Sequence, residues 1–164
     1  MQLDVIFDTV CPWCYIGKRR LERAVAMRPN CDVRIRWRPF MLNPDMPPSG
    51  IDRTAYLIKK FGSETRVRRV YGAIGEAGQS VEIDFAFDRI RRTPNSVSSH
   101  RLIRHAADSI NVAPLVERLF EAYFIDGVDI GDKDVLVDLG VDFGMARAEL
   151  KDYLDSDLDV AEVY

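Results

Sequence analysis

The chain has 164 residues, of which 47% are hydrophobic and 30% are charged, and its formal net charge at pH 7 is −3. These values are typical of a globular chain that forms one domain or two closely joined ones. They argue against a concentrated basic surface for nucleic acid, and no run approaches the ~20 apolar residues that a transmembrane helix needs.

The start of the chain and its cysteines indicate a cellular compartment. Residues 1–8 contain neither the basic region nor the long apolar segment of a secretory signal. Only three cysteines occur, Cys11, Cys14 and Cys31. So small and odd a number argues against a disulfide-stapled scaffold and predicts a reducing, cytoplasmic setting. In that setting a close cysteine pair is expected to be catalytic or to bind a metal.

The first elements that the sequence predicts are a strand, a turn, a helix and a second strand. Residues 3–7 form a short apolar run rich in β-branched side chains, which predicts a buried strand. A helix follows the first cysteines and ends before Pro29. Apolar and arginine side chains alternate over residues 33–38, as expected of a strand with one buried face. A right-handed parallel β-α-β unit is the arrangement that these elements favour.

Beyond this unit the pattern becomes helical. Residues 43–52 contain three prolines and a glycine, which predict a loop and the best candidate for a boundary. Apolar residues then recur at helical spacing, and the strongest stripe runs over residues 115–124. Asn95 and Asp132 stand where N-caps are expected, and Pro114 suits a first helical turn.

The motif that carries chemistry is Cys11-Pro12-Trp13-Cys14, between the first strand and the helix. A thiolate is the reactive form of cysteine, and a free thiol with a pKa near ~8.5 is mostly protonated at neutral pH. If Cys11 caps the helix, unpaired N–H groups and the helix dipole lower its pKa. Pro12 suits the first helical position, and Trp13 offers an apolar rim to a partner.

This placement predicts a thiol–disulfide oxidoreductase. The Cys11 thiolate attacks a substrate disulfide and forms a mixed disulfide with it. Cys14 lies one helical turn later, faces inward and displaces the substrate in a second step. The reverse sequence would form a disulfide in the substrate, and the direction depends on the reduction potential.

A zinc site is the alternative interpretation of a Cys-x-x-Cys pair. Structural zinc sites have four ligands, and the remaining candidates are Cys31, His100 and His105. These three form no second pair with zinc-ligand spacing, so the strand–helix context favours redox chemistry and no metal is expected. Cys31 follows a Pro-Asn turn and is interpreted as a bystander.

A longer stretch, Cys11-Pro12-Trp13-Cys14-Tyr15-Ile16-Gly17-Lys18-Arg19-Arg20-Leu21-Glu22, closely resembles the opening of the DsbA-like proteins of the FrnE group. Further blocks resemble the same group, and in chain order they are Trp37-Arg38-Pro39-Phe40, Leu42-Asn43-Pro44, Asp84-Phe85, Arg92-Thr93-Pro94-Asn95, His100-Arg101-Leu102 and Asp129-Ile130-Gly131-Asp132. The ordered series covers most of the chain and is much more specific than the cysteine motif alone.

The resemblance implies an α/β protein with a thioredoxin-like fold interrupted by a large all-helical insertion. It divides the chain into a first β-α-β part at 1–45, the insertion at 46–157, and the start of a helix at 158–164 that returns to the thioredoxin-like part. It also implies dithiol–disulfide exchange, with Cys11 as the nucleophile and Cys14 as the resolving thiol.

A sister branch of the family keeps other functions open. The 2-hydroxychromene-2-carboxylate isomerases and kappa-class glutathione transferases have a similar plan but place a serine where Cys11 stands. One alternative is therefore a glutathione-dependent isomerase or transferase, with glutathione as co-substrate. Another is a non-catalytic binding module on the same fold. The intact cysteine pair favours redox chemistry that needs no cofactor besides the pair itself.

One feature of the family has no counterpart in the sequence. The family continues past the insertion into a strand preceded by a cis-proline that docks the substrate. The only prolines after residue 48 are Pro94 and Pro114, and both stand among expected helices. The C-terminal strands are therefore expected to be missing, as in a truncated or partial sequence.

Residues outside the motif carry weaker expectations. In the family, the helix after Asn95 covers the active-site cleft, which suggests substrate or glutathione contacts for Asn95, His100 and Arg101; a helix cap and ordinary hydrogen bonds are the plainer interpretation. Asp8 is a candidate to tune a thiol or relay a proton, or else a turn carboxylate. The expected partner is a disulfide-containing protein or small molecule, with neither nucleic acid nor membrane, and the oligomeric state stays open.

Overall fold

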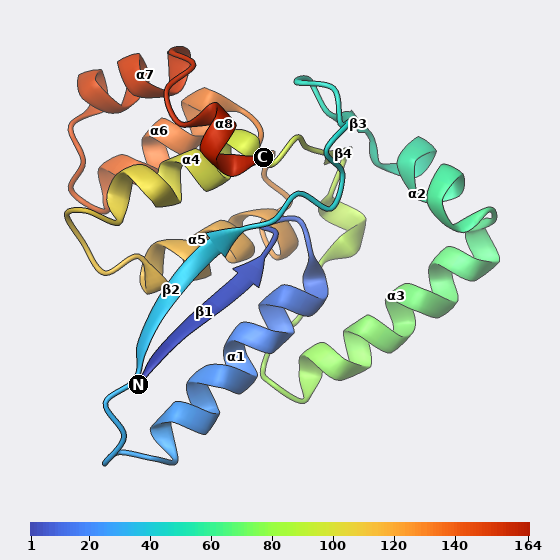
Figure 1. Cartoon of the computed structure of the whole chain (residues 1–164). Coiled ribbons are helices and arrows are strands. Elements are labelled where there is room, and N and C mark those ends of the chain that lie inside the picture. The colour runs from blue at the N-terminus through green and yellow to red at the C-terminus, as the bar shows by residue number, and fades with distance from the viewer.

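The computed structural model describes residues 1–164, in which two long parallel strands pack against a larger group of helices (Figure 1). The strands are β1 (Gln2–Phe7), β2 (Arg34–Pro39), β3 (Ile51–Asp52) and β4 (Arg92–Thr93). The helices are α1 (Pro12–Ala26), α2 (Arg53–Phe61), α3 (Glu64–Gln79), the single 3-10 turn η1 (Phe87–Arg89), α4 (Val97–Ala106), α5 (Ala113–Phe124), α6 (Lys133–Asp142), α7 (Arg147–Asp155) and α8 (Val160–Val163).

The predicted β-α-β unit is confirmed, but β1 is not the buried strand that its apolar run predicted, because one of its faces is open and Ile6 is 68% exposed. Strands β1 and β2 pair in parallel, with Leu3 opposite Ile35 and Val5 opposite Trp37. Along β2 the arginines are exposed while the residues between them are partly buried, as the alternating pattern predicted. The C-terminal ends of the two strands therefore lie together, next to the start of α1, and this edge positions the cysteines (Figure 1).

Helix starts agree with the capping signals in two cases and differ by one residue in a third. Asp132 is the N-cap of α6 and accepts a hydrogen bond from the Asp134 amide at 2.8 Å, and Pro114 lies in the first turn of α5. The N-cap of α4 is Ser96 rather than Asn95. The Asn95 side chain nevertheless accepts from the Val97 amide at 2.9 Å, because an Asx turn reaches the same free N–H from one position earlier.

The segment expected to be all-helical also contains a two-residue antiparallel ladder between β3 and β4. Ile51 lies opposite Thr93 and Asp52 opposite Arg92. Gly50 precedes the ladder with φ +69°, and a Cβ there would meet the Thr93 carbonyl oxygen at 2.6 Å. Pairs this short leave no period-two pattern in a sequence, which explains why the ladder was not predicted.

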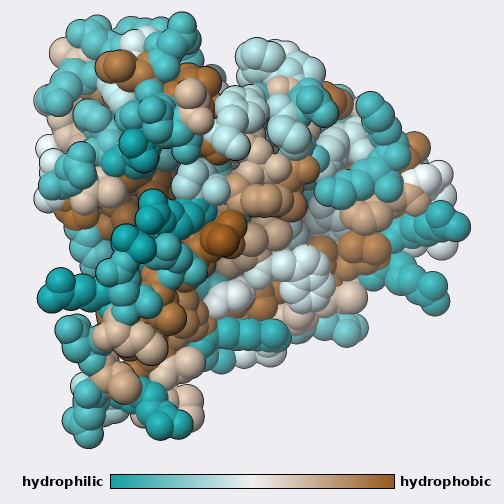
Figure 2. Space-filling view, in the orientation of Figure 1, coloured by the Kyte–Doolittle hydropathy of each residue, from teal (hydrophilic) through white to brown (hydrophobic).

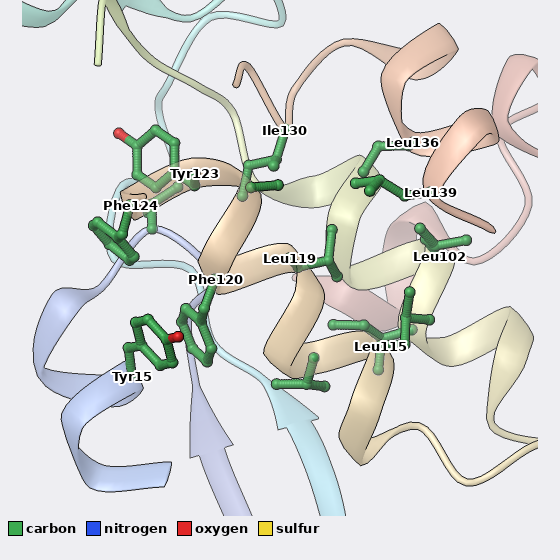
Figure 3. Close-up of a cluster of buried hydrophobic side chains, with 14 of the residues drawn as sticks. Tyr15, Leu102, Leu115, Leu119, Phe120, Tyr123, Phe124, Ile130, Leu136 and Leu139 are labelled. Atoms are coloured by element: carbon green, nitrogen blue, oxygen red, sulfur yellow. The ribbon is translucent and has the colours of Figure 1, made fainter. Parts of the chain in front are cut away.

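The core is centred on α5, the helix with the strongest predicted apolar stripe. Leu115, Leu119 and Phe120 have no exposed surface, and Figure 3 shows them between residues of α1, α4 and α6. The rings of Tyr15 and Phe120 stack with their centroids 4.9 Å apart and so attach α1 to α5. Full burial of such side chains stabilises the fold by roughly 1.5–3 kcal/mol each. The helix that begins at the cysteines therefore has a rigid support.

Candidate active site

Cys11 is the N-cap of α1, as the sequence predicted. Its backbone is extended, with φ −99° and ψ 111°, and Pro12 occupies the first helical turn. The Cys11 amide donates to the Asp8 carbonyl at 3.1 Å, and its carbonyl accepts from the amides of Cys14 and Tyr15 at 3.1 and 3.3 Å. These bonds form the turn between β1 and α1. The Cys11 sulfur thereby lies at the amino end of the helix, where unpaired amides favour negative charge.

The thiol of Cys11 is made acidic mainly by its neighbour. Several effects together lower the pKa of Cys11 from 9.0 to about 7. The hydrogen bond from the Cys14 thiol is the largest of them, and burial opposes it. The backbone amides of Cys14 and Trp13 also lower this pKa, and the charge of Asp8 opposes them. The amides at the helix start thus lower the pKa of Cys11 less than the Cys14 thiol does. The sequence did not predict this order.

Cys14 has the opposite character. Its hydrogen bond to Cys11 and then its burial raise its pKa above the ordinary value, and the backbone amide of Asp8 only partly offsets this. Both cysteines are free thiols with intermediate exposure, whereas Cys31 is exposed. At neutral pH the pair therefore divides into one ionisable, reactive sulfur and one that keeps its proton until the first has reacted.

A buried polar contact lies directly behind the pair. The side chains of Asp8 and His100 are each 1% exposed, and the His100 Nε2 atom lies 3.3 Å from an oxygen of Asp8. The other Asp8 oxygen accepts a hydrogen bond from the Leu42 amide at 2.8 Å. Burial raises the pKa of Asp8, but His100, Leu42 and Ser96 together bring the pKa below its ordinary value. Asp8 is therefore ionised at neutral pH.

The three residues predicted to contact substrate have different positions. His100 is brought to the site through Asp8. The Asn95 side chain donates to the Met46 carbonyl at 2.7 Å and accepts from α4, so both ends of its amide are occupied. Arg101 is 2% exposed and donates to four carbonyl oxygens of residues 153–158, beyond the far side of α4. Substrate contact by these residues stays a prediction.

Apolar side chains surround the opening of the site. Trp13 is 50% exposed and Phe40 is 52% exposed, and Leu42 follows on the loop after β2. In Figure 2 apolar surface lies in the middle of the visible face, over the C-terminal ends of the strands, among hydrophilic residues. The apolar rim expected of Trp13 stays a prediction.

A second cluster near Cys11 was not predicted. Arg53 is buried without a carboxylate partner, and its guanidinium donates to the hydroxyls of Thr93, Tyr123 and Tyr71. Burial raises the pKa of Tyr71, and the charge of Cys11 adds to this effect. Tyr71 belongs to an apolar helical stripe in the sequence, so no local signal separates it from an ordinary core tyrosine.

Two further observations bear on the alternatives. At no place in the chain do three or more His, Cys, Asp or Glu side chains gather in a way that would hold a metal ion. None of the helices combines the length and the apolar character needed to cross a membrane.

A parallel β-α-β unit with a Cys-x-x-Cys pair at its strand–helix junction defines the class of thioredoxin-like thiol proteins. Residues 2–163 match the family described as DSBA-like thioredoxin domain. The chain therefore belongs to this family, and the resemblance drawn from the motif blocks is confirmed, as is the thioredoxin-like fold with its helical insertion.

Comparison with individual proteins gives the same result. The chain is 29% identical to the uncharacterized protein YwbO of Bacillus subtilis in an alignment 163 positions long that covers 95% of this chain and 72% of that protein. It superposes on a probable DsbA oxidoreductase from Streptomyces coelicolor with a TM-score of 0.88 and 25% identity, over 99% of this chain and 71% of that one. A 2-hydroxychromene-2-carboxylate isomerase matches with a TM-score of 0.69 and 16% identity, over 100% of this chain and 75% of that one, which is a likeness of fold.

Proposed function

We propose that the protein is a thiol–disulfide oxidoreductase in which Cys11 is the nucleophile and Cys14 the resolving thiol. The observation that carries the proposal is the unequal pair at the start of α1. The pKa of Cys11 is lowered to about 7, while that of Cys14 is raised. A structural thiol pair has no need of this inequality, whereas exchange chemistry requires one sulfur that attacks and another that waits.

The reaction has two exchange steps. The Cys11 thiolate attacks one sulfur of the substrate disulfide, the substrate S–S bond breaks, and the other substrate sulfur leaves as a thiolate. Cys14 then loses its proton and attacks the Cys11 sulfur, and the second substrate sulfur leaves. The substrate gains two electrons and the Cys11–Cys14 disulfide forms. Run backwards, the same steps oxidise a dithiol substrate.

The proposal includes a partner class and a setting. The partner is a protein or small molecule that carries a disulfide, and the apolar surface formed by Trp13, Phe40 and Leu42 supports contact with apolar groups beside that disulfide. The setting is a reducing, cytoplasmic compartment, supported by the small, odd number of cysteines. No cofactor is required besides the thiol pair, and glutathione is a candidate co-substrate.

Trapping of the intermediate tests the proposal. In a Cys31→Ser background, Cys14→Ser leaves Cys11 without its resolving partner. This variant should accumulate a mixed disulfide with a protein disulfide or with glutathione disulfide, detected by intact mass and mapped to Cys11. Cys11→Ser is the matched control and should trap nothing.

The outcomes also separate the alternatives. Absence of any trapped species with several disulfide donors would contradict the proposal. Turnover of a glutathione-dependent isomerisation that survives Cys14→Ser would favour the isomerase alternative. A Cys11 that alkylates as slowly as a free peptide cysteine would favour a non-catalytic binding module.

A further inference from the structure

The contact between Asp8 and His100 joins two parts of the molecule that are far apart in the sequence. Asp8 follows β1, three residues before Cys11, and His100 comes from the middle of α4. His100 is 3% exposed, and its ring packs edge-on against Phe7, with the centroids 5.2 Å apart. Together with the 3.3 Å approach to the carboxylate, this packing holds the imidazole in one orientation. A helix of the insertion thus presents a basic group to the active-site strand.

The position of Asp8 is unfavourable for the chemistry proposed above. Its carboxylate is removed from solvent, so water screens its charge only weakly. That charge opposes the ionisation of Cys11 and also of Cys14. A buried negative charge disfavours a nearby thiolate, and Asp8 is held in the ionised form by its hydrogen bonds. A basic side chain in contact with Asp8 would offset that charge.

We propose that His100 is a positioning residue that holds Asp8 and offsets its negative charge, so that the Cys11 thiolate persists beside a buried carboxylate. The inference rests on the proposed function, because an acidic Cys11 matters only if that sulfur attacks. The helical insertion then has an electrostatic role in the reaction, in addition to covering the site. His100 acts through Asp8 and does not touch the reacting sulfur.

Other charged and titratable groups face the same region. On the side of the cysteines they are Cys14 of α1, Tyr71 of α3, and Arg53 and Tyr56 of α2, which act on Tyr71. On the other side, His100 lines a cavity of about 550 Å³ together with Arg36, Arg38, Arg104, His105, Asp108 and Asp159. The arginines of this cavity have partners of their own, Asp4 for Arg36 and Arg38 and Asp159 for Arg104. His100 is the basic side chain in contact with Asp8.

The experiment compares four variants in a Cys31→Ser background: Asp8→Asn, His100→Gln, the double variant, and His105→Gln. His105 is the matched control, because it is the other histidine of the chain and lies on the same helix. Its ring stacks on Tyr153 and does not contact Asp8. The readout is the alkylation rate of Cys11 across pH, resolved by site with mass spectrometry. This readout needs no turnover and no substrate disulfide, so it is separate from the trapping experiment.

The proposal predicts a dependence on Asp8. His100→Gln should slow alkylation of Cys11 about tenfold at about pH 6, as expected when a nearby charge loses its counterpart. In the Asp8→Asn background the same His100→Gln change should have an effect below about twofold, since no charge is left to offset. His105→Gln should behave as the parent. A purely structural His100 would alter stability without this dependence on Asp8.

Several results would overturn the inference. A folded His100→Gln variant with unchanged alkylation would do so, and so would a tenfold effect that persists without Asp8. If near-ultraviolet circular dichroism shows that His100→Gln does not fold, the alkylation rate of Cys11 in Asp8→Asn still tests the inference. With the charge already offset, its removal should speed alkylation by less than about threefold, whereas any larger gain would mean that His100 offsets little of it and would overturn the inference. Failure of trapping with intact alkylation behaviour would instead contradict the proposed function.

Discussion

The β-α-β unit contacts the helical part of the molecule in several places, and two of these contacts differ in kind. Between α1 and α5 aromatic rings meet, with Tyr15 stacked on Phe120 and close to Phe124, beside ion pairs of Lys18 and Arg19 with Glu117. Between the end of β1 and α4 the contact is polar and equally dry. There Asp8 meets His100, and the hydroxyls of Thr9 and Ser99 lie 2.7 Å apart with no exposed surface on either residue.

This difference separates stability from reactivity. The aromatic contact tolerates small shifts in geometry and stabilises the fold in proportion to the area it buries. The polar contact is directional, since each buried donor and acceptor has a cost when it is left unpaired. Of the two contacts, only the one at α4 contains a charge, that of Asp8, that is among the main effects on the pKa of Cys11. Variants of the first contact should therefore change stability alone, and variants of the second should change the chemistry of Cys11.

The largest expected effect lies at the thiol pair itself. Cys11→Ser should abolish disulfide exchange, by at least about a thousandfold, because a serine hydroxyl does not ionise near neutral pH and the remaining thiol of the pair, Cys14, keeps its proton. Insulin reduction or refolding of a scrambled protein substrate measures this loss. Cys31→Ser is the matched control and should keep full activity; a large loss there would contradict the bystander role.

The next effect lies at the aromatic contact. Phe120→Ala should destabilise the protein by about 3–5 kcal/mol, because it removes a fully buried ring and leaves a cavity against Tyr15. Urea unfolding followed by circular dichroism measures the change. The alkylation rate of Cys11 in the folded variant should stay within about twofold of the parent, since neither ring carries a charge. A marked change in the alkylation rate would contradict the distinction, because the aromatic contact would then affect the reactivity of Cys11 as well as stability.

A smaller effect concerns acid stability at the polar contact. The folded pKa of Asp8 is lowered from its ordinary 3.8, so its ionised form stabilises the fold above pH 3.8, and this contribution is lost as pH falls through the folded pKa. Asp8→Asn should therefore cost about 1–2 kcal/mol at pH 7 and less at about pH 3. Urea unfolding at both pH values measures it. If the loss of unfolding free energy in Asp8→Asn were larger at about pH 3 than at pH 7, the ionised form of Asp8 would not be the stabilising one.

The smallest effect concerns the neighbouring hydroxyl pair. Thr9→Val keeps the side-chain shape and removes one buried hydrogen bond, while Ser99 keeps its bond to the Ser96 carbonyl at 2.8 Å. The expected cost is about 1 kcal/mol, and Cys11 should react as before. Thermal unfolding of Thr9→Val and Thr9→Ser measures this cost. Thr9→Ser is the control, because serine retains the hydroxyl.

Much of the fold follows from sequence periodicity, and the rest depends on long-range contacts. The β-α-β unit and α5 were predicted because local patterns of period two and 3.6 report burial directly. The position of Cys11 at a helix start was predicted because Pro12 and the preceding strand fix it. The β3–β4 ladder was not, since two-residue strands leave no period.

The site shows the same division. Asp8 and His100 were each considered as candidates, but they are 92 residues apart, and a single sequence does not report which side chains meet. The dominant effect of the Cys14 thiol on Cys11 was also missed, because it depends on side-chain orientation within the turn. Arg101 shows that adjacent residues can have different roles. His100 contacts Asp8 at the site, whereas the guanidinium of Arg101 donates to the carbonyls of Tyr153 and Leu158.

The central claim is that Cys11 is an acidic thiol beside a Cys14 that keeps its proton. The most direct measurement is the pH dependence of Cys11 alkylation in the fully reduced Cys31→Ser protein, resolved by site with mass spectrometry and repeated in Cys14→Ser. We expect a midpoint near pH 7 that moves clearly upward when the Cys14 thiol is removed. A midpoint near 9, the ordinary value for a free thiol, in the protein with both thiols would contradict it.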